Sequence, residues 1–157
     1  MREVIEDSVA ATSQLFKERA VTLEARLPDR VPGVVADLDR IVQVVLNLLS
    51  NAVKFVQPGS GRVEVTLAED GEFVRVDVRD NGQGVSLHDQ QIIFDKFRQA
   101  GDALTGKPQG SGLGLHISRR IIEHFGGRMW VTSRPGEGAC FSFTLPQVRD
   151  LAFARAA

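Results

Sequence analysis

Hydrophobic residues recur at helical intervals of three and four positions in three segments of the chain, residues 2–20, 36–56 and 112–125. This spacing places apolar side chains on one stripe of a helix. Asp37 is a candidate N-cap for the second helix, because Asp is a preferred residue at that position. A shorter helix is expected at about residues 86–94. The chain is therefore predicted to contain three amphipathic helices and one short one.

Strict alternation of apolar and polar residues marks the expected strands. Residues 21–27 form one such stretch, which Pro28 ends. Residues 61–80 read as a hairpin around a Glu-Asp-Gly turn, and residues 128–145 read as a second hairpin around a Gly-containing turn. This mixture of helices and hairpins predicts an α+β fold, with helices layered on one face of a largely antiparallel sheet.

Composition narrows the function classes. The 157 residues suit one domain with one core, and a net charge of −1 argues against nucleic-acid binding or contact with an anionic membrane. Cys140 is the only cysteine, which excludes an internal disulfide and fits a reducing, cytoplasmic compartment. No apolar run approaches the roughly 20 residues of a spanning helix. A longer, membrane-anchored parent protein is compatible with these features.

The stretch NLLSNAVKF carries a polar stripe in an otherwise apolar helix. Asn47, Asn51 and Lys54 follow one another at intervals of four and three residues, so they share one helix face. A solvated face is the usual explanation, but Asn costs about 0.5 kcal/mol relative to Ala inside a helix. Carboxamides suit a polar pocket, an Asn oxygen is a hard ligand for Mg²⁺, and Lys can contact phosphate. On the stripe alone both interpretations stay open.

Two glycine-containing motifs add candidate chemistry. In DNGQG, Asp80 ends a strand and is followed by Gly82 and Gly84. A simple turn would explain the triplet, whereas the second glycine leaves room for a flat ligand or another backbone, and the carboxylate could accept from the amine of adenine. In GSGLGL, glycines open the last helix, where free N–H groups favour phosphate. This signal is weak, and it matches neither the P-loop nor the dinucleotide fingerprint.

Taken in order, the motifs resemble the catalytic, ATP-binding domain of sensor histidine kinases. That family shares a superfamily with DNA gyrase, the heat-shock chaperone and the mismatch-repair ATPase. NLLSNAVKF resembles its Asn box, DNGQG its first glycine box and GSGLGL its second, while FDKF from Phe94 to Phe97 resembles its phenylalanine box and GEG from Gly136 to Gly138 a third glycine box. The resemblance runs from about Glu3 to Pro146. Residues 1–146 are therefore the expected domain and residues 147–157 a tail or linker.

The resemblance implies a two-layer α/β sandwich with helices on one face of a mixed sheet, and Mg²⁺-ATP between the helices and a lid. It implies that Asn51 binds Mg²⁺, that Asp80 takes the adenine amine, and that Asn47 and Lys54 are catalytic. The other implied nucleotide-binding positions are Lys54, Gly82, Gly84, Phe94, Lys96, Phe97, Arg98, Lys107, Gly110, Ser111, Gly112, Leu113 and Gly114. Core packing would equally explain the phenylalanines, and a solvated surface would equally explain the basic residues. Residues 98–111 lack any period and are expected to form a mobile lid.

Departures from the family pattern shape the functional hypothesis. Gyrase and chaperone relatives carry a water-activating Glu where this chain has Asn47, and an uncharged carboxamide cannot act as that base. Asn47 would instead hold a histidine or a water in place. Ala139 stands where many relatives have Thr or Ser, so one hydroxyl contact is expected to be missing.

The predicted function is transfer of the γ-phosphoryl group of ATP to a histidine on a separate, dimerising helical domain, with a response regulator downstream. His88, His116 and His124 are expected to be surface or helix-face residues rather than acceptors. The isolated domain is expected to be monomeric, to bind nucleotide and not to phosphorylate itself. The alternatives are a serine-directed kinase of the same fold, a nucleotide-gated interaction module without transfer activity, and an ATP-hydrolysing clamp, which Asn47 disfavours.

Overall fold

The computed structural model describes residues 1–96 and 112–148. The expected helices and hairpins are all present, and the Asp37 side chain caps the second helix by accepting from the Arg40 N–H at 3.2 Å. In chain order the elements are α1 (Arg2–Glu18), β1 (Thr22–Arg26), α2 (Leu38–Phe55), β2 (Arg62–Asp70), β3 (Phe73–Asp80), α3 (Leu87–Ile92), α5 (Gly114–His124), β4 (Arg128–Ser133) and β5 (Ala139–Pro146).

The strands form one five-stranded sheet in the order β1-β2-β3-β5-β4. Strand β1 lies parallel to β2, with Thr22 opposite Arg62, and the remaining neighbours are antiparallel. The parallel pair is joined through α2, because a parallel connection needs a crossover. The prediction of a mixed, largely antiparallel sheet in an α+β fold is confirmed.

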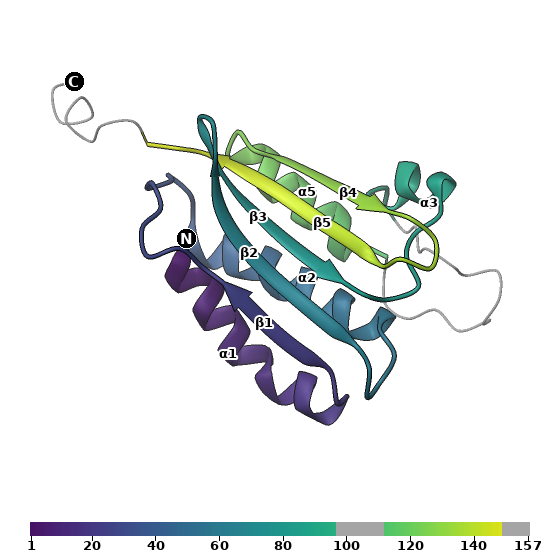
Figure 1. The fold of residues 1–157 in the computed structure, drawn as a ribbon. Helices are drawn as coiled ribbons and strands as arrows, with labels where there is room; N and C mark the ends of the chain where they lie inside the picture. Colours follow the sequence, from purple (N-terminus) through teal and green to yellow (C-terminus); the bar gives the residue numbers. More distant parts are fainter. Residues whose placement is uncertain (97–111, 149–157) are drawn as a thin grey trace, which may run out of the picture.

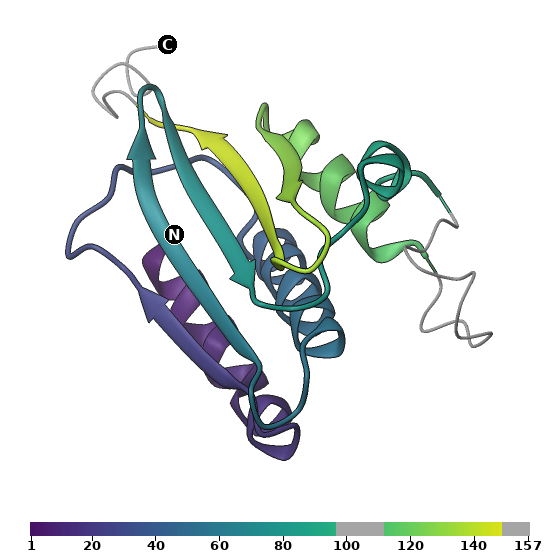
Figure 2. The same cartoon turned by 45° about the vertical axis from the view of Figure 1, so that its right-hand side comes forward.

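Helices α1, α2 and α5 lie side by side on one face of this sheet, and α3 lies at one end of it beside β4 (Figures 1 and 2). The alternation in each hairpin explains this layering, since one face of β2 and β3 carries Val63, Val65, Val76 and Val78, all at most 1% exposed. Burying such side chains stabilises the fold by about 1.5–3 kcal/mol each.

Helix α2 lies at the centre of the helical layer and packs against both α1 and α5. Ile41, Val44, Val45 and Leu49 on this helix are fully buried. Its apolar surface therefore covers most of the helix circumference, as expected for an element with neighbours on several sides. The polar stripe occupies what remains, and its Asn47 contacts α5 through Ser118.

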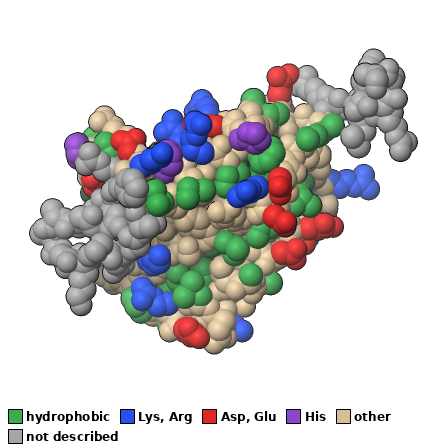
Figure 3. Space-filling view, turned by 180° about the vertical axis from the view of Figure 1, so that it is seen from behind, with side chains coloured by type: hydrophobic (Ala, Val, Ile, Leu, Met, Phe, Trp, Pro, Cys, Tyr) green, Lys and Arg blue, Asp and Glu red, His purple; other side chains and the backbone are tan. Residues whose placement is uncertain are grey.

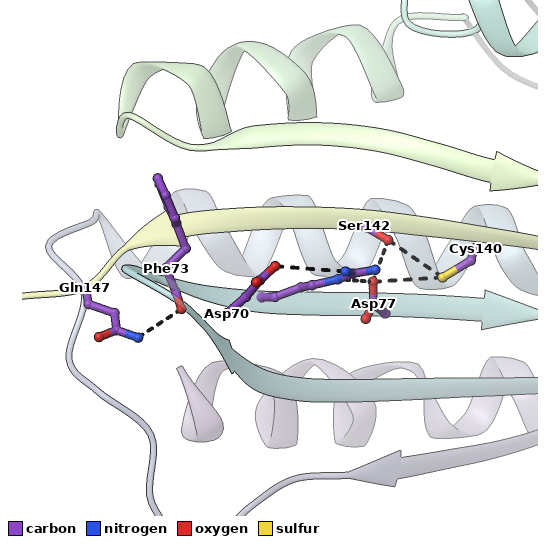
Figure 4. Close-up of polar contacts among 7 residues, drawn as sticks. Asp70, Phe73, Asp77, Cys140, Ser142 and Gln147 are labelled. Atoms are coloured by element: carbon purple, nitrogen blue, oxygen red, sulfur yellow. Dashed lines mark hydrogen bonds and ion pairs between the residues drawn. The ribbon is translucent and has the colours of Figure 1, made fainter.

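The opposite face of the sheet is polar, and no described helix covers it. Figure 4 shows Asp77, Cys140 and Ser142 pointing toward one another across β3 and β5. The Ser142 hydroxyl donates to Asp77, the Arg75 guanidinium contacts Asp77 at 2.9 Å, and the Cys140 Sγ lies 3.7 Å from the Ser142 Oγ. Burial raises the pKa of the Cys140 thiol above its usual value. Cys140 therefore lies across the sheet from the helical layer.

Ordered backbone pairing continues just past β5. The Gln147 side-chain amide donates to the Phe73 carbonyl at 3.0 Å (Figure 4). The Val148 N–H donates to the Gly33 carbonyl at 2.8 Å. Residues 147–148 thus pack onto the domain. The domain boundary expected after Pro146 stays a prediction. In the described ranges, 1–96 and 112–148, none of the helices has the length and apolar character needed to cross a bilayer.

Candidate functional site

Asp80 ends β3 with its carboxylate on the helix-facing side of the sheet. Only 7% of the residue is exposed, and its Oδ1 accepts from the Gly82 N–H at 2.8 Å and the Ala139 N–H at 3.4 Å. Burial raises the pKa of this carboxyl, and the two backbone hydrogen bonds oppose that rise. Among the described residues, no donor reaches Oδ2. The carboxylate is therefore held through one oxygen and keeps the other as an acceptor for a ligand.

The glycines after Asp80 are required by neighbouring backbone. A Cβ at Gly82 would overlap the Phe55 carbonyl at the end of α2, and a Cβ at Gly84 would overlap the Arg134 carbonyl. Gly84 also has a φ of +75°, a conformation that L side chains rarely adopt. The sequence left open whether these glycines make room for a flat ligand or for another backbone. In the structure, another backbone approaches each of them. The Gly82 contact also brings Asp80 close to the C-terminal end of α2.

The turn between β4 and β5 packs against the loop that follows Asp80. The Ser133 hydroxyl accepts from the Val85 N–H at 2.8 Å and donates to the Gly138 carbonyl at 2.6 Å. The Gln90 amide donates to the Ser133 carbonyl at 3.0 Å. Sequence reasoning did not single out Ser133 or Gln90, because a serine ending a strand carries no local signal of a distant partner.

The polar stripe of α2 divides into residues with different surroundings. Asn51 is half-buried and Lys54 is exposed, and neither side chain forms a hydrogen bond with the described part of the chain. Asn47 is also half-buried, but its Nδ2 donates to the Ser118 Oγ on α5 at 3.0 Å. The stripe is thus neither a fully solvated face nor a closed pocket. Asn51 and Lys54 stay available to a ligand, and Asn47 contacts α5.

Helix α5 begins beside Asn47. A Cβ at Gly114 would overlap the Asn47 Oδ1, so this glycine permits close approach of the two helices. The Leu113 side chain makes no capping hydrogen bond, and Gly112 before it has a φ of +67°. The first N–H groups of a helix have no intrahelical partner, which makes this end of α5 suitable for an anion.

Phe94, in the expected phenylalanine box, is a core residue. It is 6% exposed and packs edge-on against Phe141, with ring centroids 6.3 Å apart. On α5, the Arg119 guanidinium lies 5.5 Å from the Phe94 ring centroid, and the His116 Nδ1 lies 3.1 Å from the Phe94 carbonyl oxygen. The segment that leads toward the expected lid is therefore attached to α5.

A hollow of about 670 Å³ lies between α5 and the start of α2, on the helical side of the molecule. Figure 3 views the molecule from this side and shows basic and histidine side chains beside hydrophobic ones. Lys96, at the end of the first described range, is among the lining residues, and Ile117 contributes an apolar side chain that is 40% exposed. The lining also includes Arg40, His116, Arg120 and His124.

Five of the expected nucleotide-binding positions lie outside the described residues. They are Phe97, Arg98, Lys107, Gly110 and Ser111. The expected lid at residues 98–111 lies outside them as well. Among the described positions, Asp80 and the glycines after it form one group, named here the base end because adenine is expected there. The residues where α2 meets the start of α5 form a second group, named the phosphate end because phosphate is expected there.

The donor set at the phosphate end fits magnesium. Within residues 1–96 and 112–148, no group of three or more His, Cys, Asp or Glu side chains is arranged to hold a metal ion. Mg²⁺ commonly binds through one or two protein oxygens together with substrate phosphates. The Asn51 carboxamide, half-buried and without a hydrogen-bond partner among the described residues, would supply such an oxygen.

Comparison with known proteins identifies relatives over nearly the whole chain. The family model described as "Histidine kinase-, DNA gyrase B-, and HSP90-like ATPase" matches residues 36–149. The adaptive-response sensory kinase SasA of Parasynechococcus marenigrum is 40% identical over 149 residues, which cover 93% of this chain and 38% of the relative. SasA of Rippkaea orientalis is 41% identical over 138 residues, covering 87% of this chain and 34% of the relative.

Solved structures agree with these relatives. The catalytic domain of histidine kinase ThkA superposes with a TM-score of 0.81 at 30% identity, covering 94% of this chain and 92% of that chain. Full-length ShkA, solved in complex with AMPPNP, gives a TM-score of 0.81 at 32% identity over 96% of this chain and 30% of that chain. These matches confirm the predicted fold and the resemblance to histidine kinase catalytic, ATP-binding domains. This chain spans about 38% of the length of its SasA relative.

Proposed function

Because the chain belongs to the family of histidine kinase-, DNA gyrase B- and HSP90-like ATPases, we propose that it transfers the γ-phosphoryl group of ATP to a histidine on a separate dimerisation domain. The carrying observation is that α2 contacts both ends of the candidate site. Its C-terminal carbonyl at Phe55 abuts Gly82 beside Asp80, and its Asn47 abuts the start of α5. One ligand can therefore reach both the buried Asp80 carboxylate and the start of α5.

At the base end, Asp80 recognises adenine. The Oδ2 accepts from the exocyclic amine, while Oδ1 keeps its bonds to the Gly82 and Ala139 N–H groups. A hydrogen bond to a charged acceptor contributes about 1.5–3 kcal/mol. Guanine has a carbonyl oxygen at the corresponding ring position, so this carboxylate would repel it.

At the phosphate end, Asn51 and Lys54 hold the triphosphate together with the first N–H groups of α5. The Asn51 oxygen is the protein ligand for Mg²⁺, which when bound neutralises charge on the phosphates. Lys54 is exposed at the last turn of α2, and its ammonium acts as a point charge on phosphate oxygens. Such groups position the phosphates and stabilise charge, which is how phosphoryl transfer is mainly catalysed.

A histidine acceptor is favoured because the position of Asn47 holds no carboxylate that could act as a base for water. Asn47 carries no charge, whereas an imidazole has its own lone pair and attacks without prior activation. The new N–P bond forms as the Pγ–O bond breaks, and ADP leaves. We propose that Asn47 contacts the incoming imidazole. The hollow along α5, with Ile117 and basic residues around it, is the adjoining surface available to the acceptor domain.

The partners follow from this chemistry. The acceptor is the histidine-bearing dimerisation domain of the same parent protein, and a response regulator receives the phosphoryl group afterwards. Histidine kinase ThkA has been solved in complex with the response regulator TrrA. We propose that this domain is monomeric when isolated and cytoplasmic in the cell.

Nucleotide binding is tested first, by calorimetric titration of ATP with Mg²⁺ into this chain and into Asp80→Ala. We expect binding to the parent chain and strong loss in the variant. Asp70→Ala is the control, because Asp70 is exposed at the opposite end of the β2–β3 hairpin. Absence of binding to the parent chain would contradict the proposal and favour a protein-interaction module.

Transfer is then tested with a separately purified, histidine-bearing helical hairpin domain and γ-labelled ATP. We expect labelled hairpin whose phosphate is lost in acid and kept in alkali. Acid-stable phosphate would identify a serine-directed kinase instead. Rapid multiple-turnover hydrolysis by this chain alone would identify an ATP-hydrolysing clamp.

A further inference from the structure

The Asn47 carboxamide is held by two residues of α5 rather than left facing solvent. Its Nδ2 donates to the Ser118 Oγ at 3.0 Å, across 71 residues of sequence. Its Oδ1 lies against Gly114, where a Cβ would overlap it. Gly114 and Ser118 are separated by one helical turn, so both lie on the face of α5 that packs on α2. Asn51, one turn further along α2, has no such partner among the described residues.

Ser118 has no evident reason to be polar other than this contact. It is 2% exposed, in the interior of α5, where serine is a poorer helix former than alanine. A buried hydroxyl requires a hydrogen-bond partner, and the partner that the structure provides is Asn47. An alanine here would pack well and leave the Asn47 amide without its acceptor.

We propose that Ser118 is a positioning residue that fixes the orientation of the Asn47 carboxamide. This inference rests on the proposed function. The terminal torsion of an asparagine is broad and roughly two-fold, so without a partner the amide can exchange its oxygen and nitrogen edges. The hydrogen bond to Ser118 selects one of these orientations. Asn47 then presents one defined edge to the γ-phosphoryl group and the incoming imidazole.

A positioning role and a purely structural role of Ser118 predict changes in different measured quantities. Among the described residues, Ser118 forms no hydrogen bond with Asp80, Asn51 or Lys54, to which nucleotide binding is assigned. Its loss should therefore leave ATP affinity unchanged while lowering the rate of transfer. A hydrogen bond contributes about 1 kcal/mol, which corresponds to about a fivefold change in rate. A structural role would instead lower the melting temperature and ATP affinity together.

The kinetic test measures single-turnover transfer from Mg²⁺-ATP to the histidine-bearing hairpin for Ser118→Ala, Asn47→Ala and the double variant. We expect Ser118→Ala to lower the maximal rate about fivefold with an unchanged dissociation constant for ATP. In the Asn47→Ala background, Ser118→Ala should have no further effect, because Ser118 acts through Asn47. If the double variant's transfer rate instead fell by the product of the two single-variant factors, the inference would be overturned. Ser13→Ala is the matched control, since Ser13 is an exposed helical serine on α1.

A second measurement requires no transfer activity. In a ¹⁵N correlation spectrum of the nucleotide-free chain, the Asn47 side-chain amide signals are assigned by their loss in Asn47→Ala. We expect Ser118→Ala to shift these signals and leave those of Asn51 in place. Unmoved Asn47 signals would overturn the inference.

The transfer kinetics and the amide spectrum together distinguish failure of the inference from failure of the proposed function. If the parent chain transfers phosphate and Ser118→Ala matches its rate, the inference is wrong and the function stands. If the parent chain transfers nothing, the function is wrong, and the amide spectrum still decides whether Ser118 orients Asn47.

Discussion

The base end and the phosphate end of the candidate site are built in different ways. At the base end, a 7% exposed carboxylate accepts two backbone N–H groups, and glycines let three backbone segments approach one another. At the phosphate end, the half-buried Asn47 of α2 donates to the buried Ser118 of α5, whereas Asn51 is half-buried and Lys54 is exposed.

This difference indicates where the site is already organised before a ligand arrives. Backbone hydrogen bonds and close glycine contacts leave Asp80 little freedom, so the proposed adenine ligand would meet a preformed acceptor. Lys54 and Asn51 have no described partners, so their side chains must be ordered when the phosphates bind. Ordering a long side chain costs about 1.5–2 kcal/mol of conformational entropy. We therefore expect substitutions at the base end to have the larger effect on affinity.

The largest effect is expected for Asp80→Ala. Loss of a charged acceptor should weaken both adenosine and ATP by about 30-fold or more, because such a hydrogen bond contributes about 2 kcal/mol or above. Calorimetry with both ligands measures it. Asp80→Asn is the companion variant, since it can keep the Oδ1 bonds. Equal affinity of parent and both variants for adenosine would show that adenine binds elsewhere.

Asn51→Ala should reduce ATP affinity about tenfold in the presence of Mg²⁺, which corresponds to the loss of one charge-assisted contact of about 1.5 kcal/mol. The same titration in EDTA should show little difference from the parent chain, because the carboxamide acts through the metal. Adenosine binding serves as the control and should not change. An equal loss with and without Mg²⁺ would argue against Asn51 as a metal ligand.

Acidification should weaken adenosine binding and, at the same time, increase the contribution of the Asp80 carboxyl to folding stability. Burial raises the pKa of Asp80 in the folded state above its ordinary value of 3.8. As the pH falls from neutral through that raised pKa, the carboxylate is protonated and Oδ2 stops being a charged acceptor. Protonation over the same pH range also removes the cost of burying the Asp80 charge. The favourable contribution of Asp80 to the free energy of unfolding is therefore fully present below pH 3.8, and it is lost as the pH rises through the raised pKa of the folded state.

This pH effect is measured as the difference between the parent chain and Asp80→Asn, in adenosine titrations and thermal melts from pH 7 downward. The variant lacks the titrating group, so its curves report all other groups. Parent and variant curves that run parallel in both experiments would contradict the assignment.

The smallest effect is expected for Lys54→Gln. An exposed ammonium contributes about 0.5–1 kcal/mol, so ATP affinity should fall about two- to fivefold, and less at high salt. Adenosine affinity should not change, because the proposed contact of Lys54 is to phosphate, which adenosine lacks. A loss of adenosine affinity, or a loss of ATP affinity as large as that of Asp80→Ala, would contradict the division of the site into two ends.

Much of the fold could be predicted because its signals are local. The Asp37 cap depends on a residue three positions away, and the alternation in residues 61–80 places Val63 and Val65 on one face without knowledge of any partner strand. The motif order likewise indicated the family that the comparisons confirmed. The roles of the individual site residues stay predictions.

The parts that sequence reasoning missed involve distant partners. Ser118 lies 71 residues from Asn47, and the Gln90 amide contacts the Ser133 carbonyl 43 residues away. Serine and glutamine are common in helices and turns for many reasons, so neither position carried a distinguishing pattern. Gly82 was noticed, but its neighbour, the Phe55 carbonyl, could not be inferred from the DNGQG motif.

The sequence by itself determined the helices and strands, the face that each one buries, and the polar stripe on α2, since these depend on the periodicity of neighbouring residues. Only the tertiary structure decided that Asn47 is bound to α5, whereas Asn51 has no hydrogen-bond partner among the described residues, although the two asparagines look equivalent in the motif. The physical reason is that a carboxamide takes its role from the group it meets, and that group is supplied by a helix packed against α2 from far along the chain.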